Sequence, residues 1–264
     1  MDALYFNHIP KTAGTTVTEW LASHSEMRRA PAGLWSELLK LPVDSLKTYS
    51  LFSGHFYRPF HGYYGGEMKT VVFLRNPIDR SISHFQHVLR SPPHYHYERV
   101  QRHRSFLEFI NDPVTRPMIE NFQVRSIVND SDPVRLAADL APQEGRRFAL
   151  EQTIESLSLQ YSESTAVQLA KDYLMRCAVV GITELMGHSV ALIAKKMGWP
   201  PVTSLPYSNV NSEPTLSALT LSVQELEAVC GATRLDFALY EYGRSLLMNE
   251  LALSMQTIEP ALSP

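Results

Sequence analysis

Cysteine is scarce in this chain of 264 residues, which contains only Cys177 and Cys230. Two cysteines are too few for a disulfide framework, and because each lies in an apolar stretch we expect both to be buried as small hydrophobic residues. No run of about 18 apolar residues is present, so no membrane span is predicted. Met1 to Ile9 lead directly into a predicted strand and loop without the pattern of a secretion signal, so we expect a soluble, cytoplasmic protein.

An excess of positive charge is also absent, because the formal net charge is −3. A protein that wraps nucleic acid has a strongly basic balance, so we expect no nucleic-acid partner. Any site for an anion must therefore be formed locally, by a few basic side chains. The length and a hydrophobic content of 44% suffice for one substantial core, and we expect a single domain over residues 1–264.

Three apolar segments predict buried strands, and a helical pattern follows each of them. The segments are Ala3 to Ile9, Thr70 to Leu74 and Ala178 to Ile182. Repeated strand-to-helix units predict an α/β fold with a central, mostly parallel sheet between helices, which is a P-loop-like three-layer arrangement. Helix-forming residues fill 151–176, and Ser222 with Glu225 predicts a capping box before one last long helix that reaches about Leu251.

A short loop between the first strand and its helix has the composition of a phosphate site. Backbone N–H groups at a helix N-terminus favour an anion, small residues let the backbone approach it, and a lysine and hydroxyl groups add charge and donors. The loop consists of Pro10, Lys11, Thr12, Ala13, Gly14, Thr15 and Thr16. It is not a Walker A loop, because Lys11 precedes Gly14 instead of following a glycine. The alternative is a threonine-rich helix cap with an incidental lysine.

A second candidate anion site follows the strand at Thr70 to Leu74. Arg75 lies where this strand meets its loop, and Ser83 lies on the next helix. Ligands of open α/β sheets bind at the carboxyl ends of the strands, so both residues are expected to reach the same crevice as the first loop. An arginine and a hydroxyl suit a phosphate monoester. The alternatives are a surface ion pair for Arg75 and a solvent-facing Ser83.

Together the two segments resemble the 5′-phosphosulfate and 3′-phosphate motifs of sulfotransferases that use 3′-phosphoadenosine 5′-phosphosulfate (PAPS). The resemblance is greatest to the Golgi glycan branch that includes heparan sulfate 2-O-sulfotransferase. It rests on Pro10 to Thr16 and on Arg75, Asn76, Pro77, Arg80, Ser83 and Phe85. It implies transfer of a sulfuryl group from PAPS to an acceptor hydroxyl without a metal, with the nucleotide product PAP released. The chain begins without the cytosolic tail, membrane anchor and stem of Golgi members, which argues against glycosaminoglycan polymers as acceptors.

The resemblance also implies roles for individual residues. Lys11 would neutralise the leaving phosphate. His55, in a Gly-His-Phe context similar to the family's catalytic histidine, is our first candidate for the base, and a structural histidine is its alternative. Glu19 is the second candidate, although a solvated helix residue is the commoner role. Segments 28–64 and 91–150 are expected to be insertions that shape the acceptor pocket.

The acceptor itself stays open in the sequence. The hydroxyl could belong to a carbohydrate, a glycolipid or a natural product. The oligomeric state is likewise not determined by the sequence. Five histidines lie between positions 84 and 104, together with four arginines; the histidines are His84, His87, His94, His96 and His103. Their spacings match no regular set of metal ligands, so we expect a solvated loop. If that loop forms the mouth of the acceptor pocket, its positive charge would favour an anionic acceptor.

Two other functions use the same features. A P-loop-like nucleotide kinase, or a nucleotide-binding module, would share the strand-loop-helix start, but the Gly-Lys-Thr/Ser order and a clear magnesium carboxylate are missing. A catalytically dead relative that serves as a scaffold is disfavoured by the presence of Lys11, Arg75 and Ser83.

Overall fold

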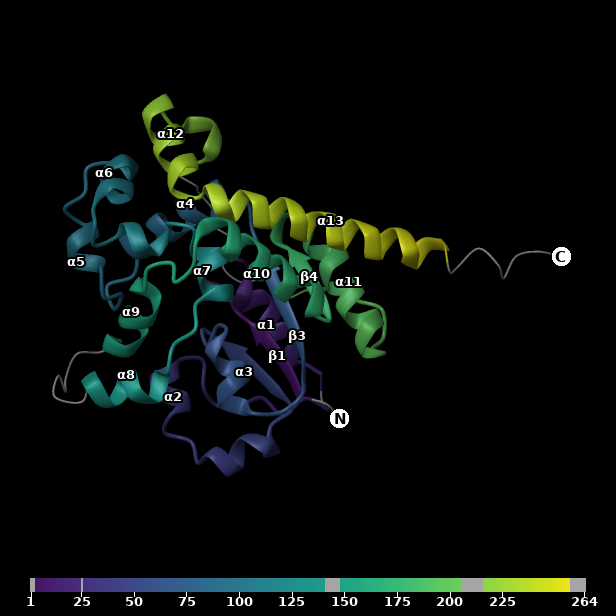
Figure 1. Cartoon of the computed structure of the whole chain (residues 1–264). Coiled ribbons are helices and arrows are strands. Elements are labelled where there is room, and N and C mark those ends of the chain that lie inside the picture. Colours follow the sequence, from purple (N-terminus) through teal and green to yellow (C-terminus); the bar gives the residue numbers. More distant parts are fainter. Residues whose placement is uncertain (1–2, 25, 141–147, 206–215, 257–264) are drawn as a thin grey trace.

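The centre of the molecule is a four-stranded sheet with the strand order β2-β1-β3-β4 (Figure 1). The computed structural model describes residues 3–24, 26–140, 148–205 and 216–256. The strands are β1 (Ala3–Asn7), β2 (Leu51–Gly54), β3 (Met68–Leu74) and β4 (Val179–Ile182). Every neighbouring pair is parallel, with Leu4 beside Leu51, Ala3 beside Met68 and Val71 beside Val179. The predicted parallel α/β sheet is confirmed.

The edge strand β2 was not predicted, and it corrects our view of segment 28–64. That segment was interpreted as an insertion, yet it supplies four buried residues that pair with β1 along their whole length. The strand is short, and its Ser and Gly residues weaken the apolar pattern by which the other strands were identified. Segment 28–64 is therefore part of the sheet as well as a contributor to loops beside it.

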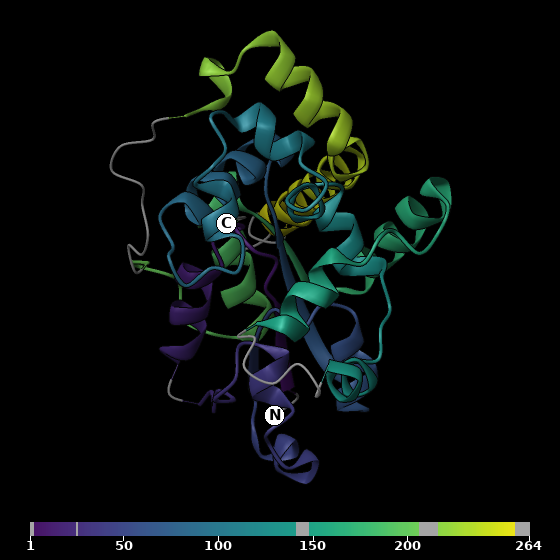
Figure 2. The same ribbon diagram turned by 90° about the vertical axis from the view of Figure 1, so that its left-hand side faces the viewer.

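Helices cover both faces of the sheet, which gives the predicted three layers (Figures 1 and 2). They are α1 (Gly14–Ala22), α2 (Trp35–Leu38), α3 (Pro59–Tyr64), α4 (Pro77–Leu89), α5 (Tyr97–Val100), α6 (Phe106–Asn111), α7 (Phe122–Val128), α8 (Pro133–Leu140), α9 (Ala149–Ser156), α10 (Glu163–Arg176), α11 (Met186–Met197), α12 (Val223–Ala232) and α13 (Arg234–Gln256). Short 3₁₀ turns lie at Val43–Thr48, Arg116–Met118, Thr183–Leu185 and Ala218–Thr220.

Side chains of the strands show which helix covers which face. On one face, the ring of Tyr5 in β1 lies 4.7 Å from that of Phe60 in α3, and Asn7 donates to the hydroxyl of Tyr173 in α10 at 3.0 Å. On the other face, Ser53 of β2 shares a buried hydrogen bond of 2.5 Å with Thr18 of α1. Successive strand residues point to opposite faces, so one short strand can hold both layers.

The stretch of helix-forming residues at 151–176 and the long helix predicted near the end of the chain each contain parts of two helices. Residues 149–156 form α9 and residues 163–176 form α10, and Arg125 donates to the carbonyl groups of Glu155 in α9 and of Leu157 just after it. The last predicted helix is divided near Thr233 into α12 and α13, and α13 extends to Gln256. The capping box before α12 is confirmed, since Ser222 and Glu225 exchange hydrogen bonds of 3.2 and 3.0 Å.

A second, smaller hydrophobic cluster lies beside the main core. It joins α4, α6 and α12 through buried side chains such as Ile82, Phe109 and Val229. Cys177 and Cys230 are free thiols, half-buried where full burial was expected. Among the described residues, no helix combines the length and the apolar character needed to cross a membrane.

Candidate active site

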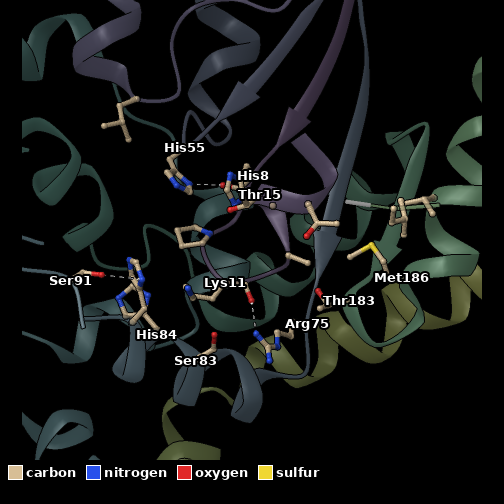
Figure 3. Close-up of a pocket in the computed structure, with 18 of the residues that line it drawn as sticks. His8, Lys11, Thr15, His55, Arg75, Ser83, His84, Ser91, Thr183 and Met186 are labelled. Carbon is tan, nitrogen blue, oxygen red and sulfur yellow. Dashed lines mark hydrogen bonds between the residues drawn. The ribbon is translucent and has the colours of Figure 1, made fainter. Parts of the chain in front are cut away.

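The carboxyl ends of all four strands open onto one cavity of about 1070 Å³. The loops after β1, β2, β3 and β4 contribute Lys11, His55, Arg75 and Thr183 to its lining, as the position of ligands in open α/β sheets predicts. Lys11 lies between two ends of the cavity, with His55, His84 and Ser91 on one side and Thr183 and Met186 on the other (Figure 3). The two predicted anion-binding segments therefore meet at one place.

The loop after β1 has a constrained backbone. Lys11 and Ala13 have φ angles of 71° and 64°, in the left-handed region that non-glycine residues adopt at a cost of about 1–3 kcal/mol. Donors from other elements hold it there: Arg75 Nη1 donates to the Lys11 carbonyl at 3.1 Å, and Arg80 Nε donates to the Pro10 carbonyl at 3.1 Å. The loop is thus shaped by α4 and by the end of β3.

The N-terminus of α1 points its backbone toward this loop without a side-chain cap. Its N-cap residue is Ala13, no side chain accepts a hydrogen bond there, and the first turn carries no acidic residue. Unpaired N–H groups and the positive end of the helix dipole favour an anion at such a position. Pro10, Lys11, Ala13, Gly14, Thr15 and Thr16 all line the cavity.

Two residues of the loop act differently from the prediction. Thr12 was expected to offer a hydroxyl to phosphate, but it is fully buried outside the cavity lining and donates to the carbonyl of Ile9 at 2.9 Å. Gly14 was expected to make room for phosphate, yet a Cβ at this position would lie 1.7 Å from the Nε2 atom of His8. The imidazole of His8 occupies that space; it stacks on the ring of Phe6 and lies 4.4 Å from the tilted ring of His55.

Arg75 and Ser83 line the same cavity, from the end of β3 and from α4. The local sequence explains their placement, because the Asn76 side chain accepts from the N–H groups of Ile78 and Asp79 and Pro77 begins α4. The side chain of Gln123 in α7 clamps the backbone of Arg75 with two hydrogen bonds of 2.9 Å. The strand end and the helix start are therefore fixed relative to the loop.

Arg80, the other arginine of this motif, does not line the cavity. Its guanidinium is 1% exposed, lies 4.3 Å from the ring of Phe122 and donates to the carbonyls of Pro10 and Met118. Burial lowers its pKa to about 10. Arg80 therefore holds the loop from outside the cavity lining.

Positive charge is concentrated beside the loop. Burial, and then the positive charge of Arg75, lower the pKa of Lys11 from its usual value to about 8. Burial also lowers the pKa of Arg75, although Asp79 and Glu184 partly oppose this. A buried cation with a lowered pKa gains from the arrival of an anion, which restores its charged form.

His55 lines the cavity, and one of its two ring nitrogens is engaged in a hydrogen bond. Its Nδ1 atom lies 2.7 Å from the carbonyl oxygen of His8, and because a carbonyl can only accept, Nδ1 carries the proton. The other nitrogen, Nε2, is then the basic one in the neutral ring. The second candidate, Glu19, lies on an exposed position of α1 and is not among the residues that line the cavity. Its position gives no support for a role as base.

The histidine-rich segment is not the solvated loop that we expected. His84 and His96 are each 3% exposed, and His84, His87 and His94 line the cavity. Burial lowers the pKa of His87 to about 4 and of His94 to about 3, and holds that of His84 well below its usual value. Its arginines Arg90, Arg99, Arg102 and Arg104 do not line the cavity. Among the described residues, no group of three or more potential ligands is placed to hold a metal ion.

Two glutamates on α9 line the cavity and were missed from the sequence. Glu155 accepts hydrogen bonds from the hydroxyls of Tyr57 at 2.6 Å and Tyr95 at 2.5 Å. Glu151 is 5% exposed and accepts from the backbone N–H of Ser36 at 2.9 Å. Their i,i+4 spacing places them on one face of a helix, but that spacing does not indicate which surface the face contacts.

These features define an α/β protein whose predicted anion-binding loop, second basic segment and candidate base meet in one cavity. The chain belongs to the sulfotransferase family, whose sequence model matches residues 1–243. The crystal structure of a sulfotransferase from Alicyclobacillus acidocaldarius is similar at a TM-score of 0.49 and 12% sequence identity, over 94% of this chain and 96% of that chain. No curated protein sequence matches this chain significantly.

Proposed function

We propose that this sulfotransferase moves a sulfuryl group from PAPS to a hydroxyl of a small-molecule or glycan acceptor. The observation that carries the proposal is the meeting of Pro10–Thr16 with Arg75 and Ser83 in one cavity. A donor with phosphate groups at both ends of an adenosine needs two separate anion sites facing one space. The similarity of both segments to the Golgi glycan branch supports a glycan among the acceptors.

The residues present fit this donor. The N-terminus of α1 and Lys11 would hold the 5′-phosphosulfate, while Arg75 and Ser83 would hold the 3′-phosphate. Thr183, Met186, Gly187 and Val190 offer a less charged wall for the adenosine. When bound, the donor supplies an activated sulfuryl group on a phosphate leaving group.

The chain's own residues then supply a base and a counter-charge. His55 Nε2 accepts the proton of the acceptor hydroxyl, because Nδ1 is already committed to the His8 carbonyl. The acceptor oxygen bonds to sulfur while the bond from sulfur to the phosphate oxygen breaks. Lys11 and the N–H groups of the loop neutralise the negative charge that develops on the leaving oxygen. The fixed loop backbone keeps these donors in place throughout.

Nucleotide binding tests the first part of the proposal. PAP without magnesium should raise the melting temperature, corresponding to about 2.7 kcal/mol at a hundredfold excess over its Kd, whereas ATP with magnesium should have little effect. The reverse order would favour the nucleotide-kinase alternative. Isothermal calorimetry with PAP gives the Kd directly, and absence of binding would refute the proposal.

A matched pair of lysine variants tests the second part. Lys11→Ala should weaken PAP binding at least tenfold and reduce the transfer of radiolabelled sulfate about a hundredfold or more, because it removes the counter-charge of the leaving group. Lys40→Ala, at an exposed position outside the cavity lining, is the control and should leave both unchanged. Wild-type protein that binds PAP but transfers no sulfate to any hydroxylated acceptor would instead support the catalytically dead scaffold.

A further inference from the structure

At the end of the cavity that contains His55, some side chains have polar atoms without a hydrogen-bond partner. Within the described part of the chain, neither ring nitrogen of His84 has a partner, and neither does the Oε2 atom of Glu151. His84 is 3% exposed and Glu151 is 5% exposed, and both line the cavity. Buried polar groups without partners are costly, by about 1–3 kcal/mol each, so their presence beside a cavity points to a ligand that satisfies them.

These side chains lie at the end of the cavity that contains the candidate base His55, which we call the acceptor end. Glu155 connects the surroundings of His55 with those of His94 through two hydrogen bonds. It accepts one from Tyr57, whose ring lies 6.2 Å from the ring of His55. It accepts the other from Tyr95, whose ring lies 4.4 Å from the ring of His94. Glu151 accepts from the N–H of Ser36, close to Gly33, whose carbonyl accepts from the N–H of His55. The nucleotide wall at Thr183 and Met186 lies on the other side of Lys11 (Figure 3).

The chemistry of this end differs from that of the loop. Two acidic side chains, Glu151 and Glu155, face it together with His84, His87 and His94, while the arginines of the histidine-rich segment do not line it. Burial keeps these histidines in their neutral form, as their lowered pKa values indicate. A neutral imidazole offers one donor and one acceptor, and a carboxyl oxygen offers an acceptor.

We infer that the acceptor is an uncharged, polyhydroxylated molecule such as a neutral saccharide, bound through hydroxyl groups by Glu151 and His84. A hydroxyl donates and accepts, so hydroxyls satisfy both nitrogens of His84 and the free oxygen of Glu151. A carboxylate or sulfate on the acceptor would lie beside two acidic side chains, and of the arginines that the structure describes only Arg75 lines the cavity. The inference rests on the proposed function, and it reverses the anionic acceptor that the sequence suggested.

Matched acceptors provide the test. Neutral glucosides, the corresponding glucuronosides and the corresponding amino sugars are compared by kcat/KM for sulfate transfer, after PAP binding has been confirmed by calorimetry. We expect neutral members to exceed their uronate counterparts at least tenfold. Preference for uronates, preference for amino sugars, or transfer to no member despite PAP binding would each overturn the inference. Failure of PAP to bind would instead refute the proposed function.

A variant of Glu151 separates recognition from folding. Glu151→Gln keeps an oxygen for the Ser36 N–H but loses the negative charge, so the neutral acceptor should bind about tenfold more weakly and the discrimination against uronates should shrink. The Kd of PAP should stay within about twofold. Glu227→Gln, at an exposed position on α12 outside the cavity lining, is the matched control. Unchanged acceptor KM and calorimetric affinity in Glu151→Gln would overturn the inference.

A second variant guards against a purely structural role. His84→Phe removes both unpartnered nitrogens and keeps an aromatic ring beside Phe109, 6.4 Å away. If His84 binds the acceptor, this variant should lose acceptor affinity while its melting temperature stays the same or rises. A fall in melting temperature with unchanged acceptor affinity would assign His84 to the core and contradict the inference.

Discussion

Single residues in this site have environments that their sequence motif did not reveal. Thr12 and Gly14 both match the phosphate motif, but neither does what the motif suggested. The Thr12 hydroxyl donates to the backbone of the loop, and the missing side chain of Gly14 leaves room for His8. Arg80 matches the second motif and is buried under the loop that it holds. A motif therefore combines residues that contact the ligand with residues that keep the contacts in place.

Lys11 gives a prediction at this scale, because burial and Arg75 lower its pKa to about 8. Below that pH the free protein carries the charged lysine, and above it the lysine must take up a proton when a phosphate binds. PAP affinity should therefore fall as pH rises from about 8 to about 9.5, by up to about tenfold per unit. Calorimetry in buffers of different ionisation enthalpy should detect the proton uptake.

Lys11→Arg is the variant that checks this assignment. Arginine stays charged over the whole range, so the decline in PAP affinity between about pH 8 and about pH 9.5 should disappear. An equally steep decline in Lys11→Arg would assign the titration to another group and contradict the prediction.

At the scale of elements, the closing helix α13 positions a residue of the distant cavity through α7. Asp236 near the start of α13 accepts from the backbone N–H groups of Gln123 and Val124, at 3.1 and 2.8 Å. The Gln123 side chain in turn clamps the backbone of Arg75. Because Asp236 is 1% exposed and does not line the cavity, its effect on a ligand is indirect.

Asp236→Ala should therefore change both stability and binding. Leaving two buried N–H groups unpaired should lower the free energy of unfolding by about 2–4 kcal/mol, as urea denaturation measures. The folded variant should also bind PAP several-fold more weakly, because Arg75 loses the support of Gln123. Asp236→Asn keeps one acceptor oxygen and should recover part of both losses. Asp139→Ala, at an exposed position on α8, is the control. A destabilised variant with unchanged PAP affinity would contradict the proposed link.

At the scale of the whole molecule, the charge distribution is uneven. The chain has a net charge of −3, yet Lys11 and Arg75 face the cavity near its middle, while Glu151 and Glu155 face the acceptor end. One cavity thus combines a positive region and an acidic region. This separation would suit the proposed reaction between a highly charged donor and a neutral acceptor.

The separation predicts different responses to salt. Raising the ionic strength from about 0.05 M to about 0.5 M should increase the KM for PAPS several-fold, because it screens the attraction between the donor and the basic loop. The KM for a neutral acceptor should change less than about twofold. Initial-rate measurements with each substrate varied in turn test this, and equal salt effects on both KM values would contradict it.

The sequence by itself determined the sheet type and the two predicted anion-binding segments, which line one cavity. Buried parallel strands are continuous apolar runs, and the phosphate loop is a contiguous segment, so both depend on neighbours along the chain. The acceptor end was decided by the tertiary structure. Glu151, Glu155, His84 and His94 come from three separate segments, and only packing buries them together. Burial also lowers the pKa of His84 and His94, which no pattern in the sequence indicates.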